Sequence, residues 1–196
     1  MRWVTASGVR HFSLHIAPNL GKRATPVSWV RTFGRKVTIM IIGIPRELLP
    51  GENRVAATPT TVPALLKLGY EVVVEAGAGE HAAQPDRAYE EAGARIVEPG
   101  EAWKADLVLA VNEPTDDQIS LMRAGAVLVT FLHPRQDLAL TEKLAAAGVT
   151  GLSMDMVPRI SRAQSMDALS SMANISGYRA VVEAAFAYGR TFGGQV

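Results

Sequence analysis

The chain has 196 residues, of which 48% are hydrophobic, and a formal net charge of +1. This length and composition suffice for one domain with a full apolar core. The absence of cysteine excludes disulfides, thiolate nucleophiles and cysteine-based zinc or iron–sulfur sites, and it fits a reducing compartment.

The net charge conceals two segments of different kinds. Residues 1–39 contain seven basic residues and no acidic residue, which gives +7, whereas residues 40–196 carry −6. The basic segment has weak hydrophobic periodicity, so we expect it to lie outside the folded domain. Three interpretations are open. The segment is an arginine-rich transit peptide, it is a nucleic-acid-binding arm, or it is a disordered tail or translated upstream sequence, with Met40 as the natural start. We favour the last of these and expect no nucleic-acid partner.

No apolar run approaches the roughly 20 residues that a membrane-spanning helix needs. Stretches such as 126–132 are apolar but only long enough for a strand. We therefore expect no direct membrane insertion, so that any membrane role depends on a partner.

From Met40 onward, short apolar runs rich in β-branched residues alternate with helix-like stretches, which is typical of βα units. The predicted strands are 38–44, 71–75, 95–97, 107–111, 127–131 and 150–153. The predicted helices are 61–68, 87–92, 116–122 and 138–146. Just past them stand Gly69, Gly93, Gly125 and Gly148, where a left-handed C-cap favours glycine. The predicted fold class is α/β, with a doubly wound, mostly parallel sheet of the flavodoxin-like or dehydrogenase type.

A longer helical pattern covers residues 167–188. An approximate 3.6-residue stripe is formed by Leu169, Met172, Ala173, Ala180 and Ala184. A helix of about 20 residues is some 30 Å long, which suits a connection between two domains. We therefore predict an α/β lobe at 40–166, a long interdomain helix at 167–190 and a truncated end at 191–196.

Polar side chains are concentrated at the entrance of this helix, where Arg159, Arg162, Gln164 and Asp167 lie within nine positions. The spacing of Ser161 and Gln164 predicts a reciprocal helix N-cap. Free amides and the helix dipole at such an end favour anionic or carbonyl-bearing ligands. The segment is therefore a candidate ligand-contacting loop. The alternative is that these residues only cap the helix or face solvent.

Two other motifs receive a structural interpretation. Gly77-x-Gly79-x-x-Ala82 is similar to a dinucleotide fingerprint, but Pro85 interrupts the helix that a fingerprint opens, so we predict a turn. His133 follows a predicted strand, where α/β sheets place functional groups, and could act as an acid or base. We predict a structural or vestigial role for His133. The histidines form no cluster with metal-ligand spacing, so no metal site is predicted.

Two long segments resemble a known family. They are 42–59 (IGIPRELLPGENRVAATP) and 158–185 (PRISRAQSMDALSSMANISGYRAVVEAA). In this order they closely resemble the nucleotide-binding alpha subunit of proton-translocating NAD(P) transhydrogenase, and the similarity is nearly continuous from Met40 onward. In that family the first strand begins at the counterpart of Met40, which is why we favour Met40 as the natural start.

The resemblance implies a function that needs more polypeptide than this chain. In the family, the glycine fingerprint belongs to a second, Rossmann-type NAD lobe after the counterpart of Val196, so we expect that lobe to be missing from this chain. The complete subunit moves hydride between NAD(H) and NADP(H), coupled to proton translocation through membrane-embedded and NADP-binding subunits. The resemblance implies a homodimeric, cytoplasmic component that is peripheral to the inner membrane through these partners. We expect the chain alone to be inactive and to bind NAD weakly or undetectably.

The resemblance also implies roles for the polar loop. Gln164 would reach toward the nicotinamide of NADP, which a partner domain holds, while Arg159, Asp167 and Ser170 would line the nicotinamide of NAD. The border of the bound dinucleotide would be completed by Ser165, Met166 and Ala168. Direct hydride transfer needs two nicotinamide rings in close contact rather than a general acid or base. Orientation is therefore the expected catalytic role of Gln164, Arg159, Asp167 and Ser170.

Two alternatives remain. Arg54 and His133 also resemble substrate-binding residues of alanine dehydrogenase, a relative with the same two-domain plan. However, Asn112 stands where that enzyme has a lysine, and a neutral amide supplies neither the charge nor the proton shuttle of oxidative deamination. The second alternative is a non-catalytic docking module.

Overall fold

The computed structural model describes residues 39–190 and 193. The predictions for the basic segment lie outside the described residues, apart from Ile39. The same holds for the predicted end at 191–196, apart from Gly193. Among the described helices, none combines the length and the apolar character required to cross a bilayer.

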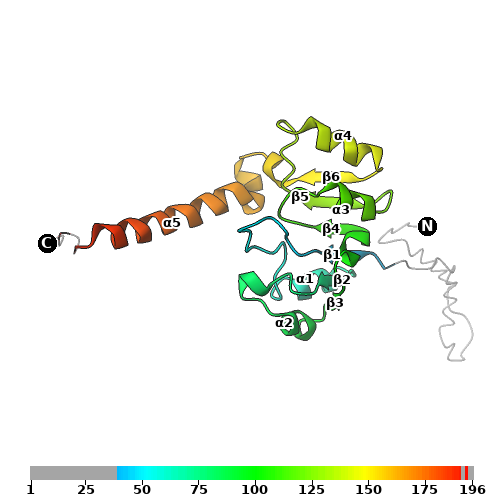
Figure 1. Ribbon diagram of the computed structural model, residues 1–196, viewed down its shortest axis with the longest axis horizontal. Coiled ribbons are helices and arrows are strands. Elements are labelled where there is room, and N and C mark those ends of the chain that lie inside the picture. Colours follow the sequence, from blue (N-terminus) through cyan, green and yellow to red (C-terminus); the bar gives the residue numbers. More distant parts are fainter. Residues whose placement is uncertain (1–38, 191–192, 194–196) are drawn as a thin grey trace, which may run out of the picture. The chain divides into compact units, whose positions relative to one another are not determined.

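Six strands form one sheet, and every pair of neighbours is parallel (Figure 1). The strands are β1 (Ile41–Ile44), β2 (Glu71–Glu75), β3 (Arg95–Val97), β4 (Leu107–Leu109), β5 (Val127–Thr130) and β6 (Thr150–Ser153). Their order is β3-β2-β1-β4-β5-β6. The doubly wound parallel architecture is confirmed, and this order narrows it to the dehydrogenase type rather than the flavodoxin-like type.

The helices lie between the strands as predicted, with a long helix last. They are α1 (Val62–Lys67), α2 (Asp86–Glu91), α3 (Asp116–Leu121), α4 (Leu138–Ala146) and α5 (Ala168–Tyr188). Short 3₁₀ helices are η1 (Glu80–Ala82), η2 (Glu101–Lys104), η3 (Met154–Met156) and η4 (Ser161–Met166). α3 begins with a capping box, in which the Gln118 amide donates to Thr115 Oγ1 at 3.3 Å and the Thr115 amide to Gln118 Oε1 at 2.8 Å.

Alternate residues of the strands divide the core between the two faces of the sheet. On one face, Ile42, Ile44, Val72 and Val74 pack with residues of α1 and α2, including the fully buried Tyr89. On the other face, Val108 and Leu128 pack with η2, α3 and α4 through residues such as Trp103, Ile119 and Leu144. Since side chains alternate along a strand, the two clusters lie on opposite faces, and the domain has three layers.

The strand order places a change of direction at the centre of the sheet. The chain builds β1, β2 and β3 outward and then returns to add β4, β5 and β6 on the other side of β1 (Figure 1). The connections after β1 and after β4 therefore leave the sheet in opposite directions. In open parallel sheets, ligands bind in the crevice at the carboxyl ends of such strands.

Candidate functional site

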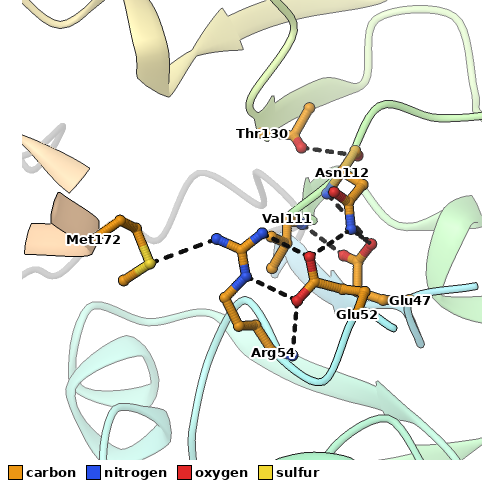
Figure 2. A network of polar contacts seen from close by, with 7 residues as sticks. All are labelled: Glu47, Glu52, Arg54, Val111, Asn112, Thr130 and Met172. Carbon is orange, nitrogen blue, oxygen red and sulfur yellow. Dashed lines mark hydrogen bonds and ion pairs between the residues drawn. The ribbon is translucent and has the colours of Figure 1, made fainter. Parts of the chain in front are cut away.

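A polar network lies at the carboxyl ends of β1 and β4 (Figure 2). Glu47 comes from the loop after β1 and Asn112 from the loop after β4. The Glu47 carboxylate accepts the Val111 amide N–H at 2.6 Å through Oε1, and the Asn112 side-chain amide at 2.9 Å through Oε2. These bonds fasten the two loops together at the point where the strand order reverses.

An ion pair with a largely buried carboxylate continues this network. Arg54 donates to Glu52 Oε1 from Nε at 2.8 Å and to Glu52 Oε2 from Nη2 at 2.6 Å. The Glu52 side chain is 8% exposed, whereas that of Arg54 is 45% exposed. The hydrogen bond from Arg54 outweighs the effect of burial and lowers the pKa of Glu52 to about 2. Glu52 is therefore ionised throughout the physiological range.

Asn112 bridges the two carboxylates. Its Nδ2 donates to Glu47 Oε2 and also to Glu52 Oε2 at 3.1 Å, and its backbone carbonyl accepts the Thr130 hydroxyl at 2.9 Å. A side-chain amide nitrogen carries two hydrogens, and both are used here. Asn112 therefore presents neither a positive charge nor a spare N–H to a ligand.

His133 follows β5 and is held by acidic side chains. Its Nδ1 lies 2.9 Å from Glu113 Oε1, and its amide N–H donates to Asp155 Oδ1 at 3.3 Å. Asp155 also accepts the Leu132 amide and the Ser153 hydroxyl. Burial raises the pKa of Asp155, but these hydrogen bonds outweigh it, so the pKa lies below its usual value. The backbone of His133 has a φ of 44°, which this acceptor helps to fix.

A cavity of 380 Å³ opens between the network and His133. Its lining includes Glu47, Asn112, Phe131, His133 and the exposed Leu48. Within residues 39–190, no group of three or more histidine and carboxylate side chains could hold a metal ion. The cavity is lined by apolar groups and by polar groups that are already hydrogen-bonded to one another, such as Glu47 with Asn112 and Glu113 with His133.

The start of α5 carries the predicted orienting residues. Asp167 is the N-cap, and it accepts the Ser170 amide N–H at 3.0 Å and the Ser170 hydroxyl at 2.5 Å. These two bonds, with a smaller contribution from the charge of Arg159, hold the pKa of Asp167 below its ordinary value. The side chains of Arg159 and Gln164 are exposed, as are Ser165 and Met166. The structure thus brings Asp167 and Ser170 into direct contact and leaves Gln164 exposed to solvent.

The predicted cap at Ser161 is wrong. Residues Ser161–Met166 form the 3₁₀ helix η4, whose N-cap is Ile160 and which has no side-chain cap. The side chain that caps the following α-helix is Asp167, because the chain turns once more before α5 begins. The glycine motif at 77–82 is a turn, as predicted: Gly77 has a φ of 73°, and its amide donates to the Asp86 carboxylate at 2.9 Å.

The two parts of the site are joined by a contact that sequence reasoning missed. Arg54 Nη1 lies 3.5 Å from the Met172 sulfur, although 118 positions separate them (Figure 2). Glu47 and Glu52 were not singled out as site residues, and Met172 was assigned only to the apolar stripe of the helical pattern. The positions of Glu47 just after a strand, and of Glu52 two residues before Arg54, are the local signals that could have suggested them.

Comparison with known proteins connects this arrangement to a family. A family model described as "Alanine dehydrogenase/PNT, N-terminal domain" matches residues 43–176. The chain belongs to this family. Within it, the chain is 55% identical over 157 residues to the NAD(P) transhydrogenase subunit alpha of Haemophilus influenzae, covering 80% of this chain and 31% of that protein. It is 37% identical over 158 residues to the alanine dehydrogenase of Mycolicibacterium smegmatis, covering 80% and 42%.

A solved structure agrees with this assignment to the alanine dehydrogenase/PNT family. The crystal structure of the transhydrogenase from Sinorhizobium meliloti matches with a TM-score of 0.72 and 45% identity, covering 74% of this chain and 44% of that one. This chain spans about a third of the length of the Haemophilus influenzae relative. The resemblance to transhydrogenase that the sequence suggested is thereby confirmed.

Proposed function

We propose that this chain is the N-terminal part of the alpha subunit of an NAD(P) transhydrogenase, in which it helps to orient the nicotinamide of NAD for hydride exchange with NADP(H). The observation that carries the proposal is the Asp167–Ser170 turn at the start of α5, beside the polar network. The greater identity to the transhydrogenase subunit than to alanine dehydrogenase supports the same choice.

The donor and acceptor groups of the turn fit a nicotinamide carboxamide. The carboxamide has an NH₂ group and a carbonyl, so holding it in one orientation needs an acceptor and a donor. Asp167 is an acceptor that its bonds to Ser170 keep ionised, and the guanidinium of Arg159, earlier in the loop, is a donor. Gln164, which can both donate and accept, is exposed and suited to a second nucleotide held by another domain. The bordering residues would be Ser165, Met166 and Ala168.

The proposal extends to the complete assembly. NAD would bind between this lobe and a second, Rossmann-type lobe, while NADP would be held by a partner subunit. The alpha component would be a homodimer on the cytoplasmic side of the inner membrane, attached through membrane-embedded subunits that carry out proton translocation. Residues 167–190 would connect the two lobes. No residue described here is assigned to proton passage.

A second candidate function is the alanine dehydrogenase lobe, which the 37% identity to a member of that class favours. His133 lines the cavity, and Arg54 belongs to the polar network that shares Glu47 and Asn112 with the cavity lining. Against it stands Asn112, whose two side-chain hydrogens are taken by Glu47 and Glu52. The position therefore offers no cation for a substrate carboxylate and no group for proton transfer.

A hybrid subunit distinguishes the two functions. Residues 40–196 replace the matching segment of the Haemophilus influenzae subunit, which is then co-expressed with its own partner subunits. We expect hydride transfer from NADPH to NAD to be within about tenfold of the parent rate, and no oxidation of alanine with NAD. The unmodified parent is the control. A hybrid that assembles but transfers no hydride, or one that oxidises alanine, would reject the proposal.

The assigned role of Gln164 can be tested in the same hybrid. Gln164→Asn shortens the side chain by one methylene, so we expect the hydride-transfer rate to fall about tenfold because the two rings are less well aligned. The Kd for NAD should stay within twofold, since Gln164 faces the other nucleotide. Ser161→Ala, at an exposed position of the same 3₁₀ helix, is the matched control. An unchanged rate in Gln164→Asn would reject this role.

A further inference from the structure

Helix α5 has few anchors in the rest of the domain. None of its residues is buried. Its four least exposed residues are Ala168, Leu169, Met172 and Ala185, and three of these four lie in the first five residues of the helix. The direction in which α5 leaves the domain therefore depends on contacts made at its start.

The contact between Arg54 Nη1 and the Met172 sulfur links the start of α5 to the network. A thioether is a weak hydrogen-bond acceptor, but it is polarisable and packs well against planar groups. The thioether of Met172 can hold α5 in place here because the Arg54 guanidinium that it contacts is rigid. The Arg54 side chain is fixed by two bonds to Glu52, and the Arg54 amide N–H donates to the same carboxylate at 2.9 Å. A planar guanidinium held in this way has little freedom to move.

The rigidity extends back to the sheet. Glu52 is hydrogen-bonded to the Asn112 side chain, and the backbone carbonyl of Asn112 is hydrogen-bonded to Thr130 at the end of β5 (Figure 2). Glu47 is hydrogen-bonded to the backbone after β4. Each of these hydrogen bonds is between 2.6 and 3.1 Å long. Glu47, Glu52 and Asn112 are only partly accessible to solvent. The Met172 sulfur is therefore in contact with a group whose position is set by the central strands.

We propose that Arg54 and Met172 are positioning residues, which fix the direction of α5 relative to the carboxyl edge of the sheet and so hold the Asp167–Ser170 turn in place. Asp167 and Ser170 lie in the same first turns of α5 as Met172, so a rotation of the helix start would move all three together. The consequence for hydride transfer rests on the proposed function, but the effect on α5 does not.

A distance measurement tests the effect on α5 in the full 196-residue chain. The chain has no cysteine, so Glu142→Cys on α4 and Ala180→Cys on α5, both exposed, provide two unique sites for spin labels. We expect a narrow distance distribution in the parent. Arg54→Gln and Met172→Ala should each broaden it and shift its mean, and the double variant should show no more change than either single variant, because both remove one contact. Met172→Leu keeps the bulk at this position and should restore the parental distribution.

Arg87→Gln is the matched control, since it removes an exposed arginine from an ion pair with Glu91 on α2, away from α5. If Arg54→Gln fails to fold, Met172→Ala still decides the question, because Met172 lies on a helix with no buried residue. The positioning role would be overturned if the distance distribution in Met172→Ala is the same as in the parent. For a folded Arg54→Gln variant, the distribution would also have to be unchanged.

The kinetic consequence is measured in the hybrid subunit. We expect Arg54→Gln and Met172→Ala to lower kcat for hydride transfer about tenfold, to leave the KM for NAD within twofold, and Met172→Leu to regain the parental kcat. Broadened distances with an unchanged kcat would overturn the link to catalysis. If the parental hybrid transfers no hydride at all, the proposed function fails, whereas broadened distances would still support the positioning of α5.

Discussion

Gly43→Ala is expected to remove a large part of the stability of the domain. A Cβ atom at Gly43 would lie 1.9 Å from the carbonyl oxygen of Ala102 and 2.8 Å from the Ala105 Cβ. The Ala102 oxygen belongs to the backbone of η2, which packs directly on this face of β1, so no side-chain rotation relieves the clash. β1 is also paired on both sides, with β2 and β4, and cannot move away without breaking the centre of the sheet.

The expected cost exceeds that of ordinary overpacking, which is about 1–3 kcal/mol. A domain of this size is stable by only about 5–15 kcal/mol, so a loss above 3 kcal/mol removes a large part of its stability. Urea denaturation followed by circular dichroism measures the loss in any soluble protein. Gly177→Ala in α5 is the matched control, because nothing lies within 4 Å of its added Cβ and alanine favours a helix. A parental urea midpoint for Gly43→Ala would contradict the close approach of η2 to β1.

The elements of the fold were predictable because each leaves a local pattern. All six strands and all five helices lie where apolar runs and helical stretches placed them, although β1 starts at Ile41 rather than residue 38 and β4 ends at Leu109 rather than residue 111. Gly69, Gly93 and Gly148 follow α1, α2 and α4 with positive φ, as expected for left-handed C-caps. Gly125 is the exception: α3 ends at Leu121 and leaves through an extended Met122, so this glycine serves a later turn.

The site was predictable only where its partners are close in sequence. Asp167 and Ser170 were assigned together and are in contact, because three positions separate them. A cap motif, however, is also local and therefore ambiguous. The Thr-x-x-Gln spacing at Thr115 forms a capping box, whereas the similar spacing at Ser161 does not, since the chain there continues as a 3₁₀ helix. Pattern alone does not distinguish the two.

The network around Arg54 could not have been derived from a single sequence. Its members come from the loops after β1 and β4, the end of β5 and the start of α5. The sequence marks Arg54 and Asn112 through their resemblance to substrate-binding positions in alanine dehydrogenase, but it does not reveal that Glu52 pairs with one and bonds the other. The strand order creates these pairings, and strand order is a property of the whole chain.

Glu52→Gln is expected to destabilise the domain by about 1–2 kcal/mol at pH 7, with a characteristic dependence on pH. The pKa of Glu52 is lowered from 4.5 to about 2, chiefly by the hydrogen bond from Arg54, and a shift of this size corresponds to about 3 kcal/mol at most. Because Arg54 is 45% exposed, solvent screening reduces that figure. The glutamine keeps one acceptor oxygen for Arg54 but loses the charge.

The sign of the pH dependence follows from the lowered pKa. A carboxyl whose pKa is depressed in the folded state stabilises the fold fully above about pH 4.5, and this contribution is lost as the pH falls toward 2, where the folded state also takes up the proton. The free-energy difference between the parent and Glu52→Gln should therefore be constant from pH 7 to about 5 and shrink toward pH 2 in urea titrations. Glu91→Gln removes the exposed partner of Arg87, and its effect should stay within about 0.5 kcal/mol at every pH. A difference for Glu52→Gln that does not shrink between pH 5 and pH 2 would mean that Glu52 stabilises the fold through its shape alone, and that the Arg54 ion pair contributes nothing.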